Sequence, residues 1–259
     1  GGQMHDTGKL GDAHVKKVEK FNDVILHHVD DAGKFKEGQE VKGVVNATRR
    51  KTIMRHHTAT HLVLQSAYRI LGPHVWQTGS NKDEDEAHID VTHYERPSRE
   101  QVHAIERMVN EKILEKIPVT PRWLDRGLAE RKYGFRLYQG SGAIGKTLRV
   151  VDIRNFDVEC CGGTHVHTTQ DLGSFKIKAV EQVQDGVIRL RYVAGLKALE
   201  YSQKNESLVN DAASVFSVQP DEIVNVGKRF FEEWKQRGNE IERAHKQIAE
   251  NLSFRLIEE

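Results

Sequence analysis

Two histidines four residues apart have the spacing of a pair of metal ligands. His57 and His61 lie in a segment whose apolar spacing predicts a helix, and there they project from one face, one turn apart. Two imidazoles in this arrangement can hold one metal ion. The pair alone is weak support, because 14 histidines in 259 residues give about one such pair by chance.

A thiol and an imidazole follow a predicted strand in a second motif, Cys-Cys-Gly-Gly-Thr-His. Cys161 and His165 flank a Gly-Gly pair, which allows a turn tight enough for both side chains to reach one ion. Histidine and cysteine donors suit Zn²⁺, a borderline-soft ion. Cys160 is the rival thiol and His167 the rival imidazole. Taken singly, Cys161 reads equally well as a small buried apolar residue and His165 as a loop histidine; the two motifs together favour metal binding.

A third stretch matches the phosphate-binding loop pattern GxxxxGK[ST]. It runs from Gly140 to Thr147 and reads GSGAIGKT. Such a loop must open a helix whose first turn faces the phosphates, whereas the residues after Thr147 are rich in Val and Ile and predict a strand. We therefore interpret this stretch as a glycine-rich loop between strands and expect no nucleotide site.

The elements that carry these motifs follow from the spacing of the apolar residues. A helix is predicted over 52–71, and a second helix begins after Ser98, which forms a capping-box pattern with Gln101, and ends before Pro118. Strands are predicted over 147–159, 174–183 and 187–194, with Asp185-Gly186 as the hairpin turn between the last two. The first ligand pair is thus expected on a helix and the second at the end of a strand.

The last two predicted strands alternate apolar and basic residues, so that one face of their sheet is apolar and the other basic. The basic residues are Lys176, Lys178, Arg189 and Arg191. The first interpretation is a solvated face, and the second is a surface that contacts phosphates. The acidic run 83–86 is interpreted as a solvated turn between the two helices.

The patterns together predict an α+β fold with a largely antiparallel sheet packed with helices, a small β-barrel-like unit at the N-terminus and a helical C-terminal extension. Short apolar runs punctuated by glycine indicate the β-barrel-like subdomain over residues 1–50. The metal motifs fall within 51–195, and long charged segments with helical spacing occupy 196–259. We expect three domains with these bounds.

A narrow apolar stripe runs along the helical segment. Ile223, Phe230, Trp234, Ile241 and Ile248 recur near a seven-residue repeat, which is too narrow for a globular core. The stripe predicts a helical hairpin or a partner helix that mediates self-association.

Composition excludes several classes of protein. Lys and Arg number 39 and Asp and Glu 38, so the net charge is +1 and any nucleic-acid contact must be a local patch. No stretch approaches the roughly 20 consecutive apolar residues of a membrane span, and the N-terminus lacks the apolar core of a signal peptide. The two cysteines are neighbours and cannot join distant loops. We expect a soluble, cytoplasmic protein.

Four short motifs combine the ligand pairs with further residues, and they are HTATHL (57–62), QTGS (77–80), ECCGGTHV (159–166) and DLGSFKI (171–177). Together they resemble the editing domain of alanyl-tRNA synthetases and the related free-standing alanyl-tRNA editing proteins. The run YGFRLYQG (133–140) resembles the archaeal branch, and the opening GGQ resembles the glycine motif of the barrel that precedes this domain. The resemblance covers residues 1 to about 195, and the helical tail matches the start of the synthetases' dimer-forming region.

The resemblance implies the roles of individual residues. His57, His61, Cys161 and His165 become the ligands of one Zn²⁺ ion, whereas Thr58 and Gln77 become pocket residues near the amino acid. The residues alone leave Gln77 as an ordinary surface glutamine and Thr58 as a residue that bonds back to its own helix.

The resemblance also implies an activity, which is that of an aminoacyl-tRNA deacylase. The substrate would be serine or glycine esterified to the acceptor end of tRNA(Ala), and the partner a second copy of the chain through the C-terminal helices. Nothing in the sequence resembles an aminoacylation domain. The rival hypothesis is a non-catalytic, zinc-stabilised module for tRNA binding and dimerisation, and a metal hydrolase acting on a small molecule is a third.

Overall fold

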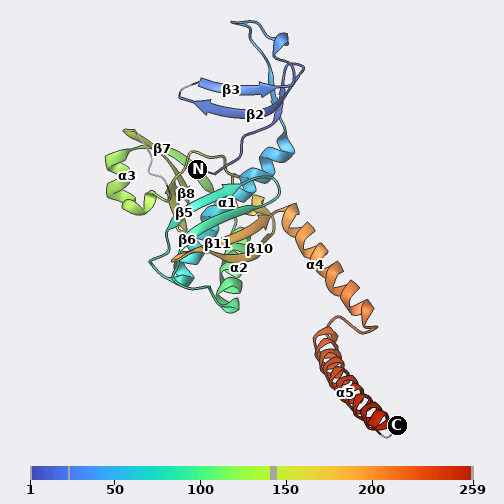
Figure 1. The fold of residues 1–259 in the computed structure, drawn as a ribbon. Helices are drawn as coiled ribbons and strands as arrows, with labels where there is room; N and C mark the ends of the chain where they lie inside the picture. The colour runs from blue at the N-terminus through green and yellow to red at the C-terminus, as the bar shows by residue number, and fades with distance from the viewer. Residues whose placement is uncertain (1, 23, 141–144, 258–259) are drawn as a thin grey trace. The chain divides into compact units, whose positions relative to one another are not determined.

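The structure, a computed structural model, describes residues 2–22, 24–140 and 145–257 (Figure 1). It forms two compact units, one reaching to Tyr201 and one beginning at Ser202. The predicted α+β class is confirmed, since helices accompany three antiparallel sheets. The finer division at residues 50 and 195 stays a prediction.

The N-terminal part is a four-stranded antiparallel sheet in the order β3-β2-β1-β4. Its strands are β1 (Gly8–Leu10), β2 (Ala13–Phe21), β3 (Val24–Val29) and β4 (Gly43–Val45). A short 3-10 helix, Ala32–Lys34, lies between β3 and β4. Within the described residues β3 and β4 are opposite edges that do not pair, so this β-rich unit is an open sheet and not a closed barrel. The three-residue strand β4 pairs with β1 alone.

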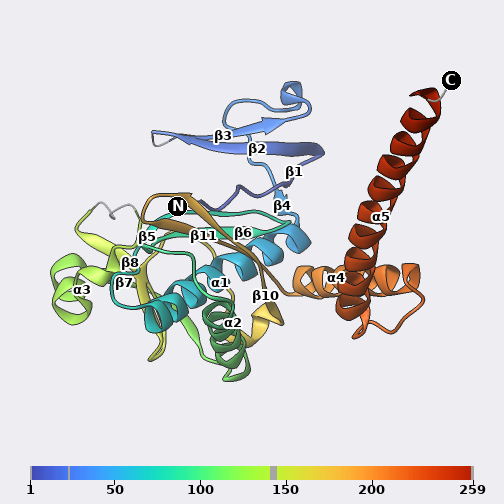
Figure 2. The ribbon, with the colours of Figure 1, turned by 60° about the horizontal axis from the view of Figure 1, so that its bottom comes forward.

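The main sheet has the strand order β10-β11-β6-β5 and is covered by two helices. Its elements are β5 (Gln77–Lys82), β6 (Ala87–Thr92), β10 (Phe175–Gln184), β11 (Val187–Ala194), α1 (Ala47–Leu71) and α2 (Arg99–Leu114). Figure 2 shows α1 and α2 on the same side of this sheet, and the apolar core lies between them and the strands. The hairpin turn between β10 and β11 falls at Asp185-Gly186, where Gly186 has a positive φ of 70°.

Capping residues set the ends of the two helices. α2 begins as predicted, with Ser98 and Gln101 making both hydrogen bonds of a capping box. α1 begins at Ala47, earlier than the predicted 52, because the Asn46 side chain accepts a hydrogen bond from the Arg49 amide. His57 and His61 lie in the middle of α1, where both side chains are buried in the first unit.

A smaller sheet, in the order β7-β8-β9, packs with a short helix over a core of its own. Its elements are β7 (Val119–Asp125), α3 (Arg126–Tyr133), β8 (Thr147–Ile153), β9 (Asp157–Cys160) and the 3-10 helix Phe135–Leu137. The single strand predicted over 147–159 is a hairpin instead, because the chain turns at Asn155, which has a positive φ of 59°. A further 3-10 helix, Thr169–Leu172, leads into β10.

The glycine-rich stretch Gly140 to Thr147 runs into a strand, since β8 begins at Thr147. Residues 141–144 of this stretch lie outside the described residues. The strand after Thr147 agrees with the interpretation of the stretch as a loop between strands.

The basic face of β10 and β11 lies opposite acidic side chains. Lys176 pairs with Glu106 at 2.7 Å, Lys178 with Glu86 at 2.5 Å, and Arg189 with Asp90 at 2.7 Å. Arg191 also pairs with Glu86. The acidic run 83–86 forms a turn between β5 and β6, as predicted, with the Asp83 amide donating to the Glu86 carbonyl. Its last residue, Glu86, is not simply solvated, because it pairs with Lys178 and Arg191 of the basic face.

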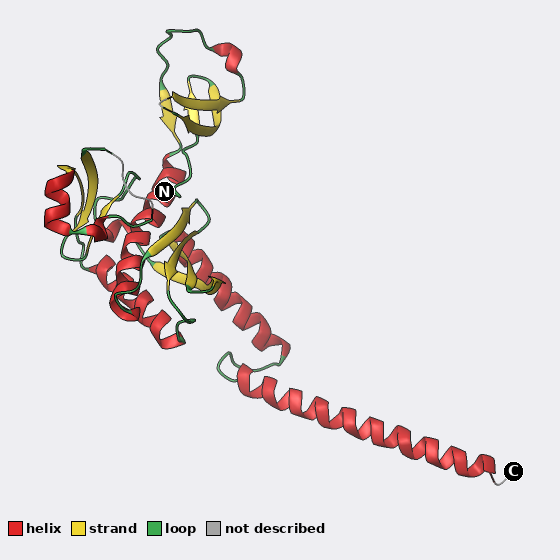
Figure 3. Ribbon diagram, turned by 60° about the vertical axis from the view of Figure 1, so that its left-hand side comes forward, coloured by secondary structure: helices red, strands yellow, loops and turns green. Residues whose placement is uncertain are grey.

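The second unit is helical. α4 (Leu196–Val215) begins in the first unit and continues into the second, where α5 (Ile223–Ile257) follows as one continuous helix ending near the C label (Figure 3). Phe230, Trp234, Ile241 and Ile248 of the predicted stripe are all more than half exposed. No helix among the described residues offers a run both apolar and long enough to cross a membrane.

Candidate metal centre

Helix α1 and the segment after β9 bring the four predicted ligands together. Nε2 of His57 lies 3.2 Å and Nε2 of His165 lies 3.3 Å from Sγ of Cys161. The ligand atoms of these three residues and of His61 all lie within 4.8 Å of one another. The cluster joins residues more than 100 positions apart in the chain, and the three imidazoles are buried.

The turn between Cys161 and His165 has room only for glycine at position 163. A Cβ placed on Gly163 would lie 2.0 Å from Cε1 of His57, which is closer than side chains tolerate. Gly162, its neighbour, has nothing within 4 Å of the same position. The backbone at Gly163 therefore packs directly against an imidazole of the cluster.

Gln3 holds the first imidazole. Its Oε1 accepts a hydrogen bond from Nδ1 of His57 at 2.7 Å, and its amide nitrogen donates to the hydroxyl of Thr164 at 2.9 Å. The Thr164 amide also donates to Gln3 Oε1. The N-terminal segment thus joins α1 to the turn that carries Cys161 and His165, two of the other predicted ligands.

Two carboxylates hold the second imidazole, and sequence reasoning missed both. Nδ1 of His61 donates to Oδ2 of Asp157 at 2.9 Å and lies 3.4 Å from Oε2 of Glu159. The signal was present in the strand, since Asp157, Glu159 and Cys161 alternate and so share one face. The partner of that face, 96 residues earlier on α1, could not be read from the strand alone.

The hydroxyl of Thr58 holds the third imidazole. It donates to the Met54 carbonyl at 3.0 Å, so the contact with Nδ1 of His165 at 3.3 Å requires the ring to donate. The Val166 amide donates to the same oxygen at 3.2 Å. Thr58 is fully buried, and it both bonds back to its own helix and touches a ligand residue.

These contacts set the tautomer of every histidine in the cluster. With Nδ1 of His57, His61 and His165 each donating, the neutral rings keep their lone pairs at Nε2, the nitrogens that face Cys161. Three imidazole lone pairs and one sulfur are the donors that zinc prefers. Histidine ligands of metals usually donate their other ring hydrogen to such partners, so this donor set fits Zn²⁺.

The electrostatics of the cluster favour a thiolate. Burial alone raises the pKa of Cys161, but its contacts with His165, His57 and His61 lower it well below the ordinary value. Burial lowers the pKa of His57 to about 3 and keeps that ring neutral. Burial also acts to lower the pKa of His61, whereas Glu159 and Asp157 outweigh it and raise that pKa well above its usual value. Without a metal the His61 ring therefore carries a second proton at Nε2, which a bound metal ion would have to displace.

The rival ligands lie elsewhere. Cys160 packs on the other side of β9 against the small core of the third sheet, and burial raises the pKa of its thiol. His167 is exposed and does not join the cluster. Alternation along the extended chain separates Cys160 from Cys161.

Gln77 begins β5 and lies in a short polar chain. Its side-chain amide donates to Oγ of Ser80 at 3.2 Å, and its backbone amide donates to Oε1 of Gln139 at 3.1 Å. Nζ of Lys82 donates to the same Ser80 oxygen at 2.6 Å. Burial lowers the pKa of Lys82 to about 8, although the charges of Cys161 and Glu159 oppose this shift. Gln77 is half-buried, whereas Thr58 has no exposed surface.

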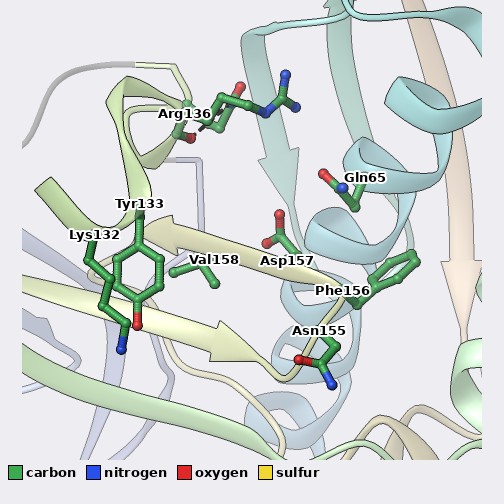
Figure 4. A pocket seen from close by; sticks show the side chains of 9 residues that line it. Gln65, Lys132, Tyr133, Arg136, Asn155, Phe156, Asp157 and Val158 are labelled. Carbon is green, nitrogen blue, oxygen red and sulfur yellow. Dashed lines mark hydrogen bonds between the residues drawn. The ribbon is translucent and has the colours of Figure 1, made fainter. Parts of the chain in front are cut away.

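A hollow of about 340 Å³ lies beside β9 (Figure 4). The figure shows Asp157 on the strand, Gln65 projecting from α1, and Lys132 and Tyr133 at the end of α3. Asp157 thus lines the hollow and also holds His61.

Comparisons with known proteins agree with the motifs. Residues 148–191 match the family described as the threonyl and alanyl tRNA synthetase second additional domain. The chain is 46% identical over 258 residues to an alanine–tRNA ligase of Methanococcus maripaludis, covering 100% of this chain and 29% of that protein. It is 44% identical over 254 residues to the alanine–tRNA ligase of Methanopyrus kandleri, and the match covers 96% of this chain and 28% of that protein. It is 42% identical over 260 residues to the alanine–tRNA ligase of Pyrococcus abyssi, and the match covers 99% of this chain and 28% of that protein. The chain thus spans less than a third of these relatives.

Proposed function

We propose, on the premise that this chain matches alanine–tRNA ligases along its length and contains their editing domain together with the start of their C-terminal region, that it hydrolyses mischarged tRNA(Ala). The bond broken is the ester that joins serine or glycine to the acceptor end of the tRNA. The chain is then an aminoacyl-tRNA deacylase that needs no nucleotide, and its setting is the cytoplasm, where tRNA is charged.

The observation that carries this proposal is the cluster of three buried imidazoles and one sulfur whose candidate ligand atoms all lie within 4.8 Å of one another. We propose that His57, His61, Cys161 and His165 bind one zinc ion. Bound zinc would supply a Lewis acid that polarises a substrate carbonyl and orients the ester. The residues around it, Gln3, Asp157 and Thr58, keep the imidazoles in the required tautomers and orientations.

Gln77 and Thr58 are proposed to have different roles at the amino-acid pocket. Gln77 is half-buried, and its side-chain amide, which donates to Ser80 Oγ, is a group that can hydrogen-bond a hydroxyl. Thr58 acts through His165, because its hydroxyl is already engaged by the Met54 carbonyl and the Val166 amide. Gln77 is therefore proposed as the residue that meets serine, and Thr58 as a positioning residue.

The need for such a site follows from the small differences between the amino acids. A pocket made for alanine cannot strongly reject glycine, which is smaller, and it penalises the extra hydroxyl of serine only weakly. A polar hydrolytic site that bonds the serine hydroxyl leaves its own groups unpaired when alanine is bound. Such a site removes the wrong product and spares the correct one.

The partners follow from the same proposal. The acceptor end of tRNA(Ala) is the macromolecular substrate, and a second copy of the chain is proposed to pack against the exposed stripe of α5.

A second candidate function is a non-catalytic module in which zinc holds α1 and the third sheet together. The observation that favours it is the number of ligands, because four protein donors can close a tetrahedral shell, as in structural zinc sites.

Single-turnover hydrolysis of seryl-, glycyl- and alanyl-tRNA(Ala) separates the two candidates. The deacylase releases serine and glycine much faster than alanine, and His61→Ala abolishes the release. A zinc-loaded wild-type chain that leaves all three esters intact while binding tRNA would support the non-catalytic module.

A further inference from the structure

Positive charge is concentrated in one short stretch of the first unit. Residues 119–140, here called the α3 lobe, comprise β7, α3 and the 3-10 helix that follows. They contain five basic and two acidic residues, although the net charge of the whole chain is +1. The remaining residues together are therefore net negative.

The basic side chains of the α3 lobe differ in their surroundings from those on the main sheet. Arg122, Arg131 and Lys132 are exposed, and within the described part of the chain none of them has an acidic partner. The two acidic residues of the lobe are used locally: Asp125 caps α3 and Glu130 accepts a hydrogen bond from Tyr138 at 2.5 Å. The lobe thus keeps its positive charge, whereas the basic face of β10 and β11 is neutralised by its ion pairs.

The same basic side chains converge on one concave surface. A hollow of about 430 Å³ lies between β7 and α3, and its lining consists of Arg122, Leu124, Leu128, Arg131, Lys132 and Tyr133. Lys132 and Tyr133 also line the hollow beside Asp157 shown in Figure 4. The two hollows share these two residues, so the concave surface continues from β7 around the end of α3 to β9.

Two large aromatic side chains project from this lobe into solvent. Trp123 is 70% exposed and Phe135 is 77% exposed. Trp123 alternates along β7 with Arg122 and Leu124, which line the hollow, so it faces away from that hollow and Phe135 is the ring considered further. Exposed aromatic rings together with unpaired cations are the combination used to bind single-stranded nucleic acid, where the cations contact phosphates and the rings stack on bases. An acidic protein partner could pair with the basic side chains, but it would not account for the exposed aromatic ring.

The lobe borders the candidate site on two sides. Oε1 of Gln139, near its end, accepts a hydrogen bond from the Gln77 amide at 3.1 Å. The Arg136 guanidinium lies 3.5 Å from the ring centre of Tyr68 and 5.6 Å from that of Trp76, which precedes Gln77. On the other side, Lys132 shares a hollow with Asp157, which holds His61. An RNA strand on the lobe would thus lie beside both the pocket residue and the metal cluster.

We propose that the α3 lobe is the surface that binds the acceptor end of the tRNA, an inference that rests on the proposed function. Arg122, Arg131 and Lys132 contact phosphates, and Phe135 stacks on an unpaired base of the single-stranded 3′ end. The face of β10 and β11, which the sequence offered as a phosphate surface, does not carry this role.

The test is binding of a fluorescent RNA hairpin with a single-stranded 3′ end that reproduces the acceptor stem, measured by anisotropy with the full chain at several salt concentrations. The triple variant Arg122→Gln, Arg131→Gln, Lys132→Gln should bind at least about tenfold more weakly. The slope of log affinity against log salt should fall by about 2 to 3, because each lost phosphate contact removes close to one unit.

A matched control removes the same charge from another exposed surface. Arg96, Arg99 and Arg107 are exposed and lie before or on α2. The variant Arg96→Gln, Arg99→Gln, Arg107→Gln should keep both the affinity and the salt slope of the wild-type chain. An equal loss in the two triple variants would show that only the total charge matters, and it would overturn the assignment to the α3 lobe.

Stacking is tested separately at Phe135. Phe135→Leu keeps an apolar side chain but removes the aromatic face, and it should weaken binding of the hairpin by about tenfold. A hairpin without its single-stranded end should bind wild type and Phe135→Leu equally. Equal losses on both RNAs would contradict stacking on the 3′ end.

The outcomes distinguish this inference from the proposed function. If the wild-type chain deacylates seryl-tRNA(Ala) and the α3-lobe triple variant binds RNA as tightly as wild type, the surface assignment is wrong and the function stands. If the wild-type chain leaves the ester intact but binds RNA through the lobe, the surface assignment stands and the function is wrong. Absence of any RNA binding by wild type would overturn the inference and favour an acidic protein as the partner of the lobe.

Discussion

Oδ2 of Asp157 accepts a hydrogen bond from Nδ1 of His61 at 2.9 Å, so that a carboxylate on β9 fixes an imidazole on α1. Both side chains are nearly inaccessible, with 2% exposure for His61 and 8% for Asp157. The pair turns Nε2 of His61 toward the other three ligand atoms.

Asp157→Asn should weaken zinc binding by about 10- to 100-fold, because the amide no longer enforces the tautomer and orientation of His61. The measurement is competition with a chromophoric chelator. Asp152→Asn on the neighbouring strand β8 is the control and should bind zinc as wild type does. Equal affinity in the two variants would show that the carboxylate does not support a metal ligand.

Gly163→Ala should lose zinc, because the added methyl group would meet the ring of His57 at 2.0 Å. Gly162→Ala, where nothing lies within 4 Å, should keep it. Zinc content after dialysis and far-ultraviolet circular dichroism distinguish a damaged site from a damaged fold. Full occupancy in Gly163→Ala would mean that His57 does not occupy this position in the metal-bound chain.

Cys161→Ala should reduce zinc content sharply from about one equivalent per chain, because the sulfur that faces three imidazoles is removed. Cys160→Ala should keep close to one equivalent, since its thiol packs against the small core of the third sheet. Elemental analysis of the purified variants gives the answer, and the reverse order would identify Cys160 as the ligand.

Gln77→Ala should narrow the ratio of seryl- to alanyl-tRNA hydrolysis by roughly tenfold to a hundredfold, because one hydrogen bond to the serine hydroxyl is worth about 1–3 kcal/mol. Thr58→Val should lower hydrolysis of both esters to a similar extent, because it removes a contact with His165 and none with the amino acid. His61→Ala should abolish hydrolysis of both substrates. Single-turnover rates for each charged tRNA are the measurement, and equal losses on both substrates in Gln77→Ala would place selectivity elsewhere.

Removal of residues 202–259 should convert a dimer into a monomer in analytical ultracentrifugation, since these residues carry the exposed stripe of α5. Trp234→Asp in the full chain should have the same effect, whereas Lys235→Asp, one position outside the stripe, should leave the dimer intact. An unchanged mass in Trp234→Asp would show that the stripe does not mediate self-association.

Local patterns predict the structure correctly where a few neighbouring residues decide it. The capping box of Ser98 and Gln101 and the strand Val187–Ala194 are of this kind. Apolar spacing predicts a start of α1 at residue 52, later than Ala47, because the cap Asn46 precedes a charged first turn that has no apolar spacing.

Contacts between distant parts of the chain could not be read in the same way. Lys178 and its partner Glu86 lie 92 positions apart in the chain, so the sequence alone does not show that this basic strand face is paired. The side chains that hydrogen-bond the imidazoles of the cluster are also distant in sequence. No pattern around Asp157 or Gln3 predicts that they pair with His61 and His57. Burial and strand pairing bring them together.

The bridge from Gln3 to His57 and Thr164 also constrains the order of folding. Its two partners lie 54 and 161 residues further along the chain, so these contacts are highly non-local. During synthesis Gln3 emerges first, yet it can be satisfied only after the turn at Thr164 has left the ribosome. Contacts between residues this far apart in sequence form slowly. We therefore expect helix α1, with His57 and His61, to form well before Gln3 and Cys161 come into contact with it. Metal capture is therefore expected to be a late event that locks the first unit after its sheets have assembled.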